Sequence, residues 1–491
     1  MAFNYRIIFK ILSTVSLIIG FTMLIPCATA IYYSETQYVR IFLQLSFAII
    51  IISSAVRHGI TYAIKYIRLR DGSFIMVGTW ILAALLGSLP YLISGYTDSF
   101  VDAFFESTAA FTTTGATVLN LDSMPHCLLM WRSVCSWLGG IGVLVLSISL
   151  IPALGLDGKT FVQSEGSAAF SDRISNKASE TISYLWAAYI IFTLLELILL
   201  KFSAMNNFDV IINTLNSVST SGIPSSSHAF HFYEDTYIEG VMTTFALLAS
   251  VNFTLYFALI HGNWQALLHN IELRAFLIMV AISIVLVSLN LHFAAGYDIV
   301  TSLRYGIFQC SAMASTSSMA ITGFEVWPAF SLTILLVLSM IGGCTFSTCS
   351  SIKVQRILIF LKLIIRGIYR RVHPRSVVAI KVGKKVISAQ KASNTTAYIL
   401  FYIFVIMMAS IILSLQNLSF ETTLTTSVAM LTNSGMGLGE TATGDFSMYN
   451  YPLRLVLCFL MFAGRLDLFT FTIVFMPSFW NPEKYRIHLQ Q

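Results

Sequence analysis

Long apolar stretches, separated by short polar connections, follow one another along almost the whole chain. They lie near residues 7–31, 38–56, 74–95, 127–155, 181–203, 238–260, 273–295, 329–365, 395–416 and 449–479. A helix needs about 20 apolar residues to cross a bilayer, and each stretch has about that length or more. The pattern therefore predicts about ten transmembrane helices.

The first stretch also has two features of a cleavable signal peptide. Arg6 and Lys10 lie at its start, and Ala28-Thr29-Ala30 resembles a cleavage site. Its apolar part is longer than the ~7–15-residue core of such a peptide, and a second apolar stretch follows at once. We therefore expect this stretch to be retained as a helix.

Four shorter segments stand between the long stretches, near residues 100–114, 208–221, 300–317 and 420–434. They are too short to cross a bilayer as helices, and each leads directly into a run of hydroxyl side chains. Irregular backbone at membrane depth is tolerated only where it is buried in protein or lines a watery cavity. The segments are therefore predicted to be re-entrant half-helices that end at such a cavity.

The hydroxyl-rich runs repeat one motif. The first reads Phe111-Thr112-Thr113-Thr114-Gly115-Ala116-Thr117, the second contains Thr220-Ser221-Gly222, and the fourth contains Asn433-Ser434-Gly435. Asp102 stands thirteen residues before Gly115, as Asp209 does before Gly222. The third run, Ala314-Ser315-Thr316-Ser317-Ser318-Met319, has serine where the other three have glycine.

Backbone carbonyls in such runs are the ligands that replace water around a potassium ion. Turning successive carbonyls toward one axis requires backbone angles that glycine adopts without steric cost. Four runs can form one ring around a potassium ion. The predicted filter residues are Thr113, Thr114, Gly115, Thr220, Ser221, Gly222, Ser317, Ser318, Ser434 and Gly435.

Composition settles the class of protein. Of the residues, 56% are hydrophobic and only 11% are charged, whereas soluble domains carry about 25% charged residues. The chain is therefore predicted to be an all-α polytopic membrane protein that contacts membrane lipids and no nucleic acid.

Charge predicts the orientation in the membrane. Basic residues gather in two connections. The first holds Arg57, Lys65, Arg68 and Arg70. The second holds Lys362, Arg366, Arg370, Arg371, Arg375, Lys381, Lys384, Lys385 and Lys391. The positive-inside rule places both connections in the cytoplasm, and ten crossings then place both termini there too. The second connection also admits two compatible roles, contact with anionic lipid and docking of a partner.

The half-helices then enter from the outside, where acidic residues gather: Asp98, Asp102, Asp122, Asp209, Glu234, Asp235, Asp298, Glu421, Glu440 and Asp445. An acidic vestibule concentrates cations. Carboxylates near half-helix N-termini also oppose the positive end of the helix dipole. For each acid, an ordinary solvated loop charge is the alternative interpretation.

Other candidate sites are weaker. Gly158-Lys159-Thr160 resembles the end of a phosphate loop, but the required earlier glycine is absent and no strand precedes it. His228 and His231 have the spacing of a metal pair without a third ligand nearby, and the seven cysteines form no CxxC motif. We therefore expect this chain to bind no cofactor and no transition metal.

Two other functional classes, a membrane enzyme and a membrane scaffold, fit the sequence less well. A polytopic enzyme acting on lipid-linked substrates should show His, Asp or Glu clustered at one membrane face, and the sequence has no such cluster. A membrane scaffold would leave the four filter-like runs without a purpose. We therefore expect an ion transporter and not an enzyme.

Further motifs accompany the four runs: Trp131-Arg132-Ser133, Trp137-Leu138-Gly139-Gly140-Ile141-Gly142, Ile151-Pro152-Ala153-Leu154-Gly155, Asn252-Phe253-Thr254-Leu255, Ile271-Glu272-Leu273-Arg274, Gly342-Gly343-Cys344, Ser347-Thr348-Cys349, Ile352-Lys353, His373-Pro374-Arg375 and Gly464-Arg465-Leu466-Asp467. With them the chain resembles, over nearly its whole length, the Trk/Ktr/HKT superfamily of potassium transporters, and specifically its bacterial TrkH/TrkG-type membrane subunits.

The resemblance implies four helix/half-helix/helix units around one pore, preceded by two extra helices. The extension is expected at residues 1–70 and the units at 71–178, 179–270, 271–392 and 393–491. It also implies potassium uptake across the bacterial inner (plasma) membrane by a homodimer. Cytoplasmic TrkA-type nucleotide-binding subunits would regulate it. Channel-like flux and symport with protons or sodium both remain open.

A gate is expected below the filter. Small polar residues interrupt the stretch at 329–365 and can break a helix beside a cavity, although a merely kinked helix is the alternative. In the family, a loop here obstructs the pore and an arginine projects into it. The gate residues implied are Gly342, Gly343, Phe346, Ser347 and Arg465. An arginine inside an apolar stretch is costly and is expected to face a partner or water.

The gate departs from the family pattern, because Thr345, Phe346, Ser350 and Ser351 stand where relatives often have small residues or glycine. Phe346 is expected to narrow the passage. Lys353 either contacts the loop or marks the cytoplasmic edge. Glu196, an acid within an apolar stretch, either couples a proton or pairs structurally.

Ser318 is the most consequential departure. A side chain there can turn a carbonyl away or add a hydroxyl ligand, so we expect weaker discrimination between potassium and sodium. In plant members of the superfamily, serine at a filter glycine of the first unit accompanies sodium permeability. Gly323 is the alternative filter residue, but Trp327-Pro328 has the spacing from Ser318 that relatives show from their glycine.

Overall fold

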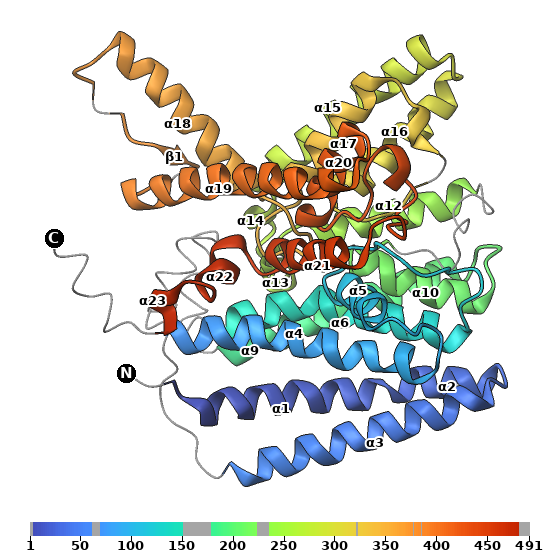
Figure 1. Cartoon of the computed structure of the whole chain (residues 1–491). Helices are drawn as coiled ribbons and strands as arrows, with labels where there is room; N and C mark the ends of the chain where they lie inside the picture. Colours follow the sequence, from blue (N-terminus) through green and yellow to red (C-terminus); the bar gives the residue numbers. More distant parts are fainter. Residues whose placement is uncertain are drawn as a thin grey trace.

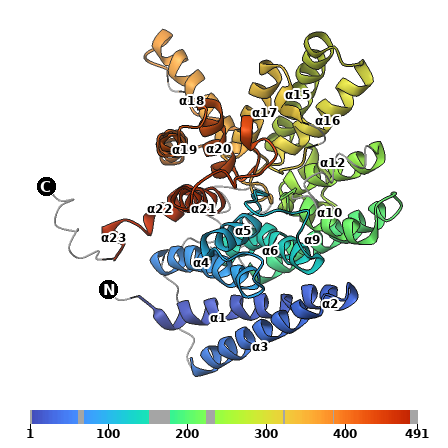
Figure 2. The same cartoon turned by 45° about the vertical axis from the view of Figure 1, so that its right-hand side comes forward.

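The computed structural model describes residues 3–60, 69–150, 178–222, 235–320, 323–376, 378–383 and 385–480. The described chain is mostly helical (Figures 1 and 2), and its strands form one short hairpin of β1 (Lys381–Val382) and β2 (Lys385–Val386).

The N-terminal extension is an antiparallel helical hairpin at one side of the molecule, drawn in dark blue in Figure 1. Helix α1 (Tyr5–Thr22) continues after Met23 into α2 (Leu24–Tyr32), and α3 (Thr36–Gly59) packs against both. The hairpin packs on the rest of the chain through contacts of α1 with α4 and of α2 with α6. The two predicted extra helices therefore lie beside the first unit.

The remaining long helices form four units, numbered here in chain order, each with a helix, a half-helix and a helix. Their elements are α4 (Leu69–Ile93), α5 (Phe100–Phe111) and α6 (His126–Leu150); α9 (Ala178–Leu200), α10 (Asn207–Val218) and α12 (Thr236–Ser250); α15 (Ile271–Ala295), α16 (Ile299–Ala314) and α17 (Ala329–Ile341); and α19 (Ala389–Leu413), α20 (Phe420–Thr432) and α21 (Tyr451–Arg465). The four predicted half-helices thus form as short helices.

The four half-helices begin in the same way. Each N-cap side chain accepts a hydrogen bond from a backbone N–H of the first turn, and these caps are Ser99, Asn206, Asp298 and Ser419. Such a cap contributes roughly 1 kcal/mol to a helix. Local sequence therefore fixes where each half-helix starts.

The units close into a ring through their half-helices. Each half-helix contacts the last helix of a neighbouring unit: α5 contacts α21, α10 contacts α6, α16 contacts α12, and α20 contacts α17. Each unit therefore has two neighbours. Unit one lies opposite unit three, and unit two lies opposite unit four.

Some predicted spans are interrupted. In the described part of the chain, 6 helices are long and apolar enough to cross a membrane, or up to 7 if α12 and α13 (Phe253–Ile260) form one span. The α12–α13 pair bends by 91°, so the stretch at 238–260 is not the single straight helix that was predicted. Asn252 stabilises the bend by capping α13, with its Oδ1 accepting a hydrogen bond from Thr254 N at 2.9 Å. The number of ten spans stays a prediction.

The basic connection leaves the helical body through α18 (Val354–Val372), which projects away from it in Figure 1. The remaining short elements are α14 (Trp264–Leu268), η2 (Phe324–Val326), η3 (Ser414–Gln416), η4 (Gly439–Thr441), α22 (Leu468–Ile473) and α23 (Pro477–Trp480).

Candidate ion filter and gate

Each half-helix ends in the same left-handed turn. Thr113, Thr220, Thr316 and Asn433 have φ values of 52°, 57°, 55° and 55°. The next residue of each run, at 114, 221, 317 and 434, donates its N–H to the carbonyl five residues earlier, at 2.9, 2.9, 2.9 and 3.0 Å. The four runs therefore share one backbone conformation up to the residue before the predicted filter glycine.

The third run diverges at the next position. Gly115, Gly222 and Gly435 have φ values of 80°, 66° and 64°, whereas Ser318 is not among the described residues with positive φ. Ser318 lies two residues after its left-handed residue, as the three glycines do. The alternative filter residue, Gly323, has a φ of −55° and precedes η2. The geometry therefore favours Ser318 as the counterpart of the glycines.

The four runs meet at these residues. A Cβ added to Gly435 would lie 1.9 Å from the carbonyl oxygen of Thr114, and one added to Gly222 would lie 2.7 Å from the backbone nitrogen of Ser318. A Cβ added to Gly115 would lie 1.9 Å from the Ser318 Oγ. Glycine at the three positions is what permits this close approach.

The Ser318 side chain lies inside the ring of runs. Its Oγ donates to the Ser221 carbonyl oxygen at 2.6 Å, and its N–H donates to the same oxygen at 3.2 Å. Because units one and three are opposite, the close approach of the hydroxyl to Gly115 means that it reaches across the ring. The Ser221 carbonyl oxygen is therefore already occupied by the Ser318 hydroxyl.

A buried ion pair supports the first run from behind. Arg132 of α6 pairs with Glu106 of α5, and both side chains are at most 1% exposed. Arg132 donates to the Ala116 carbonyl at 2.9 Å, while Glu106 accepts from Val118 N at 3.3 Å and from the Thr117 hydroxyl. Sequence reasoning did not select this pair, although Glu106, an acid inside a half-helix, is the kind of intramembrane charge that marks functional sites.

Replacing Arg132 with glutamine is expected to lower stability by about 3–5 kcal/mol, because the Glu106 charge would stay buried without its partner. The midpoint of thermal unfolding of the purified protein checks this. Arg274→Gln is the matched control, because Arg274 is exposed and also donates to a backbone carbonyl. A wild-type midpoint for Arg132→Gln would contradict the role of the pair.

A loop from Gly342 to Lys353 separates α17 from α18, so the stretch is broken and not merely kinked. Three non-glycine residues in this region, Phe346, Ser351 and Lys353, have positive φ. Lys353 N donates to Ile341 O at 2.9 Å, and this bond closes the loop on itself.

The loop contacts the ends of two half-helices. Ser350 N donates to the Thr316 hydroxyl at 3.2 Å, and the Ser351 hydroxyl donates to Thr432 O at 3.3 Å. The other side of the loop meets the α12–α13 bend, where Cys344 N donates to Ser250 O at 2.9 Å. The loop therefore lies directly against the inner ends of units three and four.

Arg465 joins the loop to unit one. Its guanidinium donates to Thr348 O at 2.6 Å and to the Ser350 hydroxyl at 3.2 Å on the loop. It also donates to Gly139 O at 2.8 Å on α6. The side chain is 4% exposed. A fixed positive charge thus bridges the loop and the opposite side of the ring.

The other predicted gate residues occupy different places. A Cβ on Gly342 would lie 2.7 Å from the Ser351 Cβ, and one on Gly343 would lie 2.9 Å from Ser250 O, so both glycines permit close packing of the loop. The Ser347 hydroxyl donates to Cys344 O at 2.6 Å. The Phe346 ring packs in an apolar cluster with α6, α9 and α13, and its role in narrowing the passage stays a prediction.

Other charged side chains lie in the loop, lie close to it, or belong to the gate motifs in the sequence. Lys353 Nζ donates to Ser347 Oγ at 3.3 Å and to Cys349 O, so Lys353 contacts the loop. Glu272, which sequence reasoning did not select as a site residue, accepts from Thr345 N at 2.6 Å. Asp467 pairs with Arg356 of α18 at 2.7 Å, and not with Arg465.

The predicted outer acids lie in different surroundings. Asp209 accepts a hydrogen bond from Asn206 Nδ2 at 2.7 Å, and Asp235 caps α12. Asp102 of α5 forms an ion pair with Arg454 of α21, and this pair joins units one and four. Asp98, Asp122, Asp298, Glu421, Glu440 and Asp445 are exposed. Their role as a cation-concentrating vestibule stays a prediction.

Glu196 is fully buried in α9, with Ser217 of half-helix α10 beside it.

The seven cysteines are buried and free, and no group of His, Cys, Asp and Glu suited to a metal ion occurs among the described residues. Several residues named in the sequence analysis lie outside the described residues. They are the motif at 151–155, Gly158-Lys159-Thr160, His228, His231, Glu234, Lys65, Arg68 and Lys384.

Known proteins share this architecture. The sequence model of the TrkH family, described as a cation transport protein, matches residues 40–482. The Trk system potassium uptake protein TrkG of Escherichia coli K12 is 30% identical over 468 residues, which is 94% of this chain and 95% of the relative. TrkH of Salmonella typhimurium is 30% identical over 483 residues, which is 97% of this chain and 100% of the relative.

The crystal structure of the potassium transporter TrkH from Vibrio parahaemolyticus superposes with a TM-score of 0.89 at 29% identity, covering 97% of this chain and 100% of that one. This match confirms the predicted all-helical membrane fold. The chain belongs to the TrkH family of cation transport proteins.

Proposed function

We propose that the chain takes up potassium across the bacterial inner membrane through the four converging runs. The observation that carries the proposal is the shared backbone turn that brings Gly115, Gly222, Ser318 and Gly435 together inside one ring of half-helices. Relatives of nearly equal length are named Trk system potassium uptake proteins. Family membership makes the chain a membrane transporter and not an enzyme.

Potassium is the transported ion and is held by backbone carbonyls at the filter residues, with hydroxyl side chains behind them. In the proposed orientation the half-helices enter from outside, and both termini lie in the cytoplasm. The exposed outer acids raise the local cation concentration. Because the negative C-terminal ends of the half-helix dipoles face the filter, they stabilise a cation there.

The proposed gate consists of the loop and Arg465. The loop abuts half-helices α16 and α20, and the arginine ties it to α6. A charge at this point repels cations that leave the filter. Opening therefore requires the loop to give up its contacts with Arg465 and with the half-helix ends.

The proposal also covers the oligomeric state, the partner subunits and the boundaries of the N-terminal extension and the four units. The chain forms a homodimer, and TrkA-type nucleotide-binding subunits dock at the basic connection carried by α18. The extension spans residues 1–70 and the units span 71–178, 179–270, 271–392 and 393–491. Both channel-like flux and coupling to protons or sodium are compatible with this arrangement.

Growth rescue tests the proposed function. Expression in a bacterial host without its own potassium uptake systems should restore growth at low potassium, and the assay is repeated without the host's regulatory subunit. No rescue at any potassium concentration, despite membrane insertion, would contradict the proposal.

The second candidate function is weakly selective transport of sodium and potassium. The hydrogen bond from the Ser318 hydroxyl to the Ser221 carbonyl favours it. An ion that binds at this level must displace the hydroxyl or accept it as a ligand. Either way, the third quarter of the ring differs from the other three.

Replacing Ser318 with glycine should raise the ratio of potassium to sodium uptake by about three- to tenfold, which corresponds to about 1 kcal/mol for one net hydrogen bond. Rubidium and sodium tracer uptake into vesicles with purified protein measures this ratio. Ser318→Ala separates the causes, because it removes the hydroxyl but keeps the Cβ. Unchanged ratios in both variants would refute the role of Ser318 in selectivity.

A further inference from the structure

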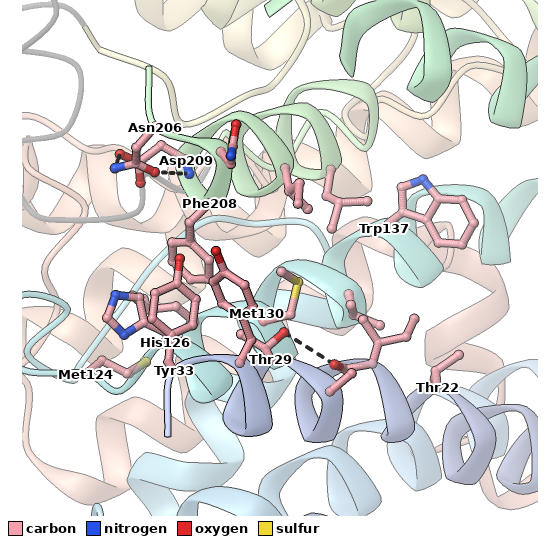
Figure 3. A pocket seen from close by; sticks show the side chains of 18 of the residues that line it. Thr22, Thr29, Tyr33, Met124, His126, Met130, Trp137, Asn206, Phe208 and Asp209 are labelled. Carbon is pink, nitrogen blue, oxygen red and sulfur yellow. Dashed lines mark hydrogen bonds between the residues drawn. The ribbon is translucent and has the colours of Figure 1, made fainter. Parts of the chain in front are cut away.

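A groove lies between the N-terminal hairpin and units one and two (Figure 3). Its volume is about 1370 Å³. The walls come from α1 and α2 on one side and from α6 and α10 on the other. Ile25 on the hairpin is 48% exposed and Ile211 on α10 is 37% exposed, so the groove opens toward the surroundings of the protein.

The groove has an apolar end and a polar end. Trp137 and Thr22 lie at one end in Figure 3, and Tyr33, His126 and Asp209 lie at the other. Leu129, Met130, Val134 and Leu215 contribute apolar lining between them. This polarity fits an amphiphile whose chain lies along the groove and whose headgroup lies at the polar end.

The length of the groove fits one membrane leaflet. Thr22 and Tyr33, which line its two ends, are eleven residues apart, or about 17 Å along a helix. Half of the hydrocarbon core of a bilayer is about 15 Å thick. The polar end lies where α2 ends and where α6 and α10 begin, which is the outer side in the proposed orientation.

Charge and aromatic rings at the polar end select the headgroup. Asp122 and Asp209 line it, and no Lys or Arg occurs among the described lining residues. The N-terminus of α6 already donates to a carboxylate, since His126 N bonds Glu35 Oε1 at 2.9 Å. The N-terminus of α10 is capped by Asn206. A phosphate therefore gains little from these helix ends, whereas an ammonium group is attracted by the acids.

An aromatic cluster lies beside the acids. The Tyr33 ring stacks on His126 with centroids 4.0 Å apart, and Phe208 packs edge-on against Tyr33 at 5.4 Å. His126 covers one face of the Tyr33 ring, but the neighbouring Tyr32 also lines the groove and is 79% exposed. Its ring is open to cation–π contact with an ammonium group. The cluster and the carboxylates therefore favour the same kind of headgroup.

We propose that this groove binds one glycerophospholipid of the outer leaflet that carries an ammonium headgroup, of the phosphatidylethanolamine type. One acyl chain lies between the hairpin and α6, and the ammonium lies near Asp122, Asp209 and Tyr33. The lipid fills the space between the N-terminal hairpin and half-helix α10, whose C-terminal end leads into the second filter run. Only the position of the headgroup in the outer leaflet depends on the proposed orientation.

Native mass spectrometry of the full-length protein, purified from nanodiscs with equal phosphatidylethanolamine and phosphatidylglycerol, tests the proposal. Wild type should retain one phosphatidylethanolamine per chain in preference to phosphatidylglycerol. Ala28→Trp, which fills the groove from the exposed face of α2, should lose it. Ala48→Trp is the matched control, because Ala48 is exposed on α3 and does not line the groove.

Asp122→Asn keeps the groove open and tests the headgroup separately. It should reduce the preference for phosphatidylethanolamine about threefold, as expected for one partly exposed ion pair. Three outcomes would overturn the proposal: equal retention of both lipids by wild type, unchanged retention in Ala28→Trp, or a dimer in wild type that Ala28→Trp converts to monomer without changing the retained lipid. The last outcome would assign the groove to a second copy of the chain.

Discussion

Replacing Gly435 with alanine is expected to reduce potassium uptake at least about 100-fold, which corresponds to about 3 kcal/mol. The new Cβ would lie 1.9 Å from the Thr114 carbonyl oxygen, and Gly435 has a φ of 64°. Thr114 belongs to the neighbouring run, so the first and fourth runs must separate to admit the methyl group. Carbonyls on two sides of the ring would then lose their positions. Tracer uptake into vesicles measures the loss.

Gly240→Ala is the matched control for this variant. Gly240 lies within α12, nothing lies within 4 Å of the position that a Cβ would take, and no positive φ is involved. Alanine in a helix interior is favoured over glycine by about 1 kcal/mol, so this variant should fold and transport like wild type. Wild-type uptake by Gly435→Ala would mean that the four runs do not form the filter.

Replacing Arg465 with glutamine is expected to raise potassium flux without regulatory subunits by about tenfold, or about 1.4 kcal/mol. Two effects act in the same direction. The fixed positive charge beside the loop disappears, and the loop loses charge-assisted hydrogen bonds from the guanidinium to Thr348 and Ser350. Such bonds are roughly twice as strong as neutral ones. Basal tracer uptake by purified protein measures the change.

Arg274→Gln again serves as the control, because Arg274 is exposed on α15 and donates its Nε–H to Leu268 O at 2.7 Å. It tests whether loss of any arginine–carbonyl bond changes flux. If Arg465→Gln folds normally and its flux equals that of wild type, the arginine is a structural tie and not part of the barrier.

The positions of the helices and runs could be predicted because their causes are local. Apolar length marks the spans, N-cap residues such as Ser99 and Asn206 mark the half-helix starts, and glycine marks backbone that needs positive φ. In the third run, Ser318 was predicted as the counterpart of glycine from its spacing to Trp327-Pro328. In the structure it lies two residues after the left-handed Thr316, as Gly115 does after Thr113.

Contacts between distant segments could not be predicted in this way. The bond from Ser318 to Ser221 depends on how units two and three meet, and the Glu106–Arg132 pair depends on the packing of α5 against α6. The bend between α12 and α13 was missed because the apolar pattern continues through it. Besides the Asn252 cap, a contact with the loop holds the bend, since Phe346 O accepts from Phe253 N at 3.0 Å. The length and hydropathy of the stretch at 238–260 cannot predict a contact with a distant segment.

Rubidium-tracer flux through the purified chain alone tests the central claim most directly. Arg465→Gln protein is placed in potassium-loaded vesicles, because wild-type protein with a closed gate would transport little. The comparison is the same protein with Gly435→Ala added. The account predicts rubidium accumulation that external potassium competes away and that the added Gly435→Ala change abolishes. Equal accumulation with and without that change would contradict a potassium pathway through the four converging runs.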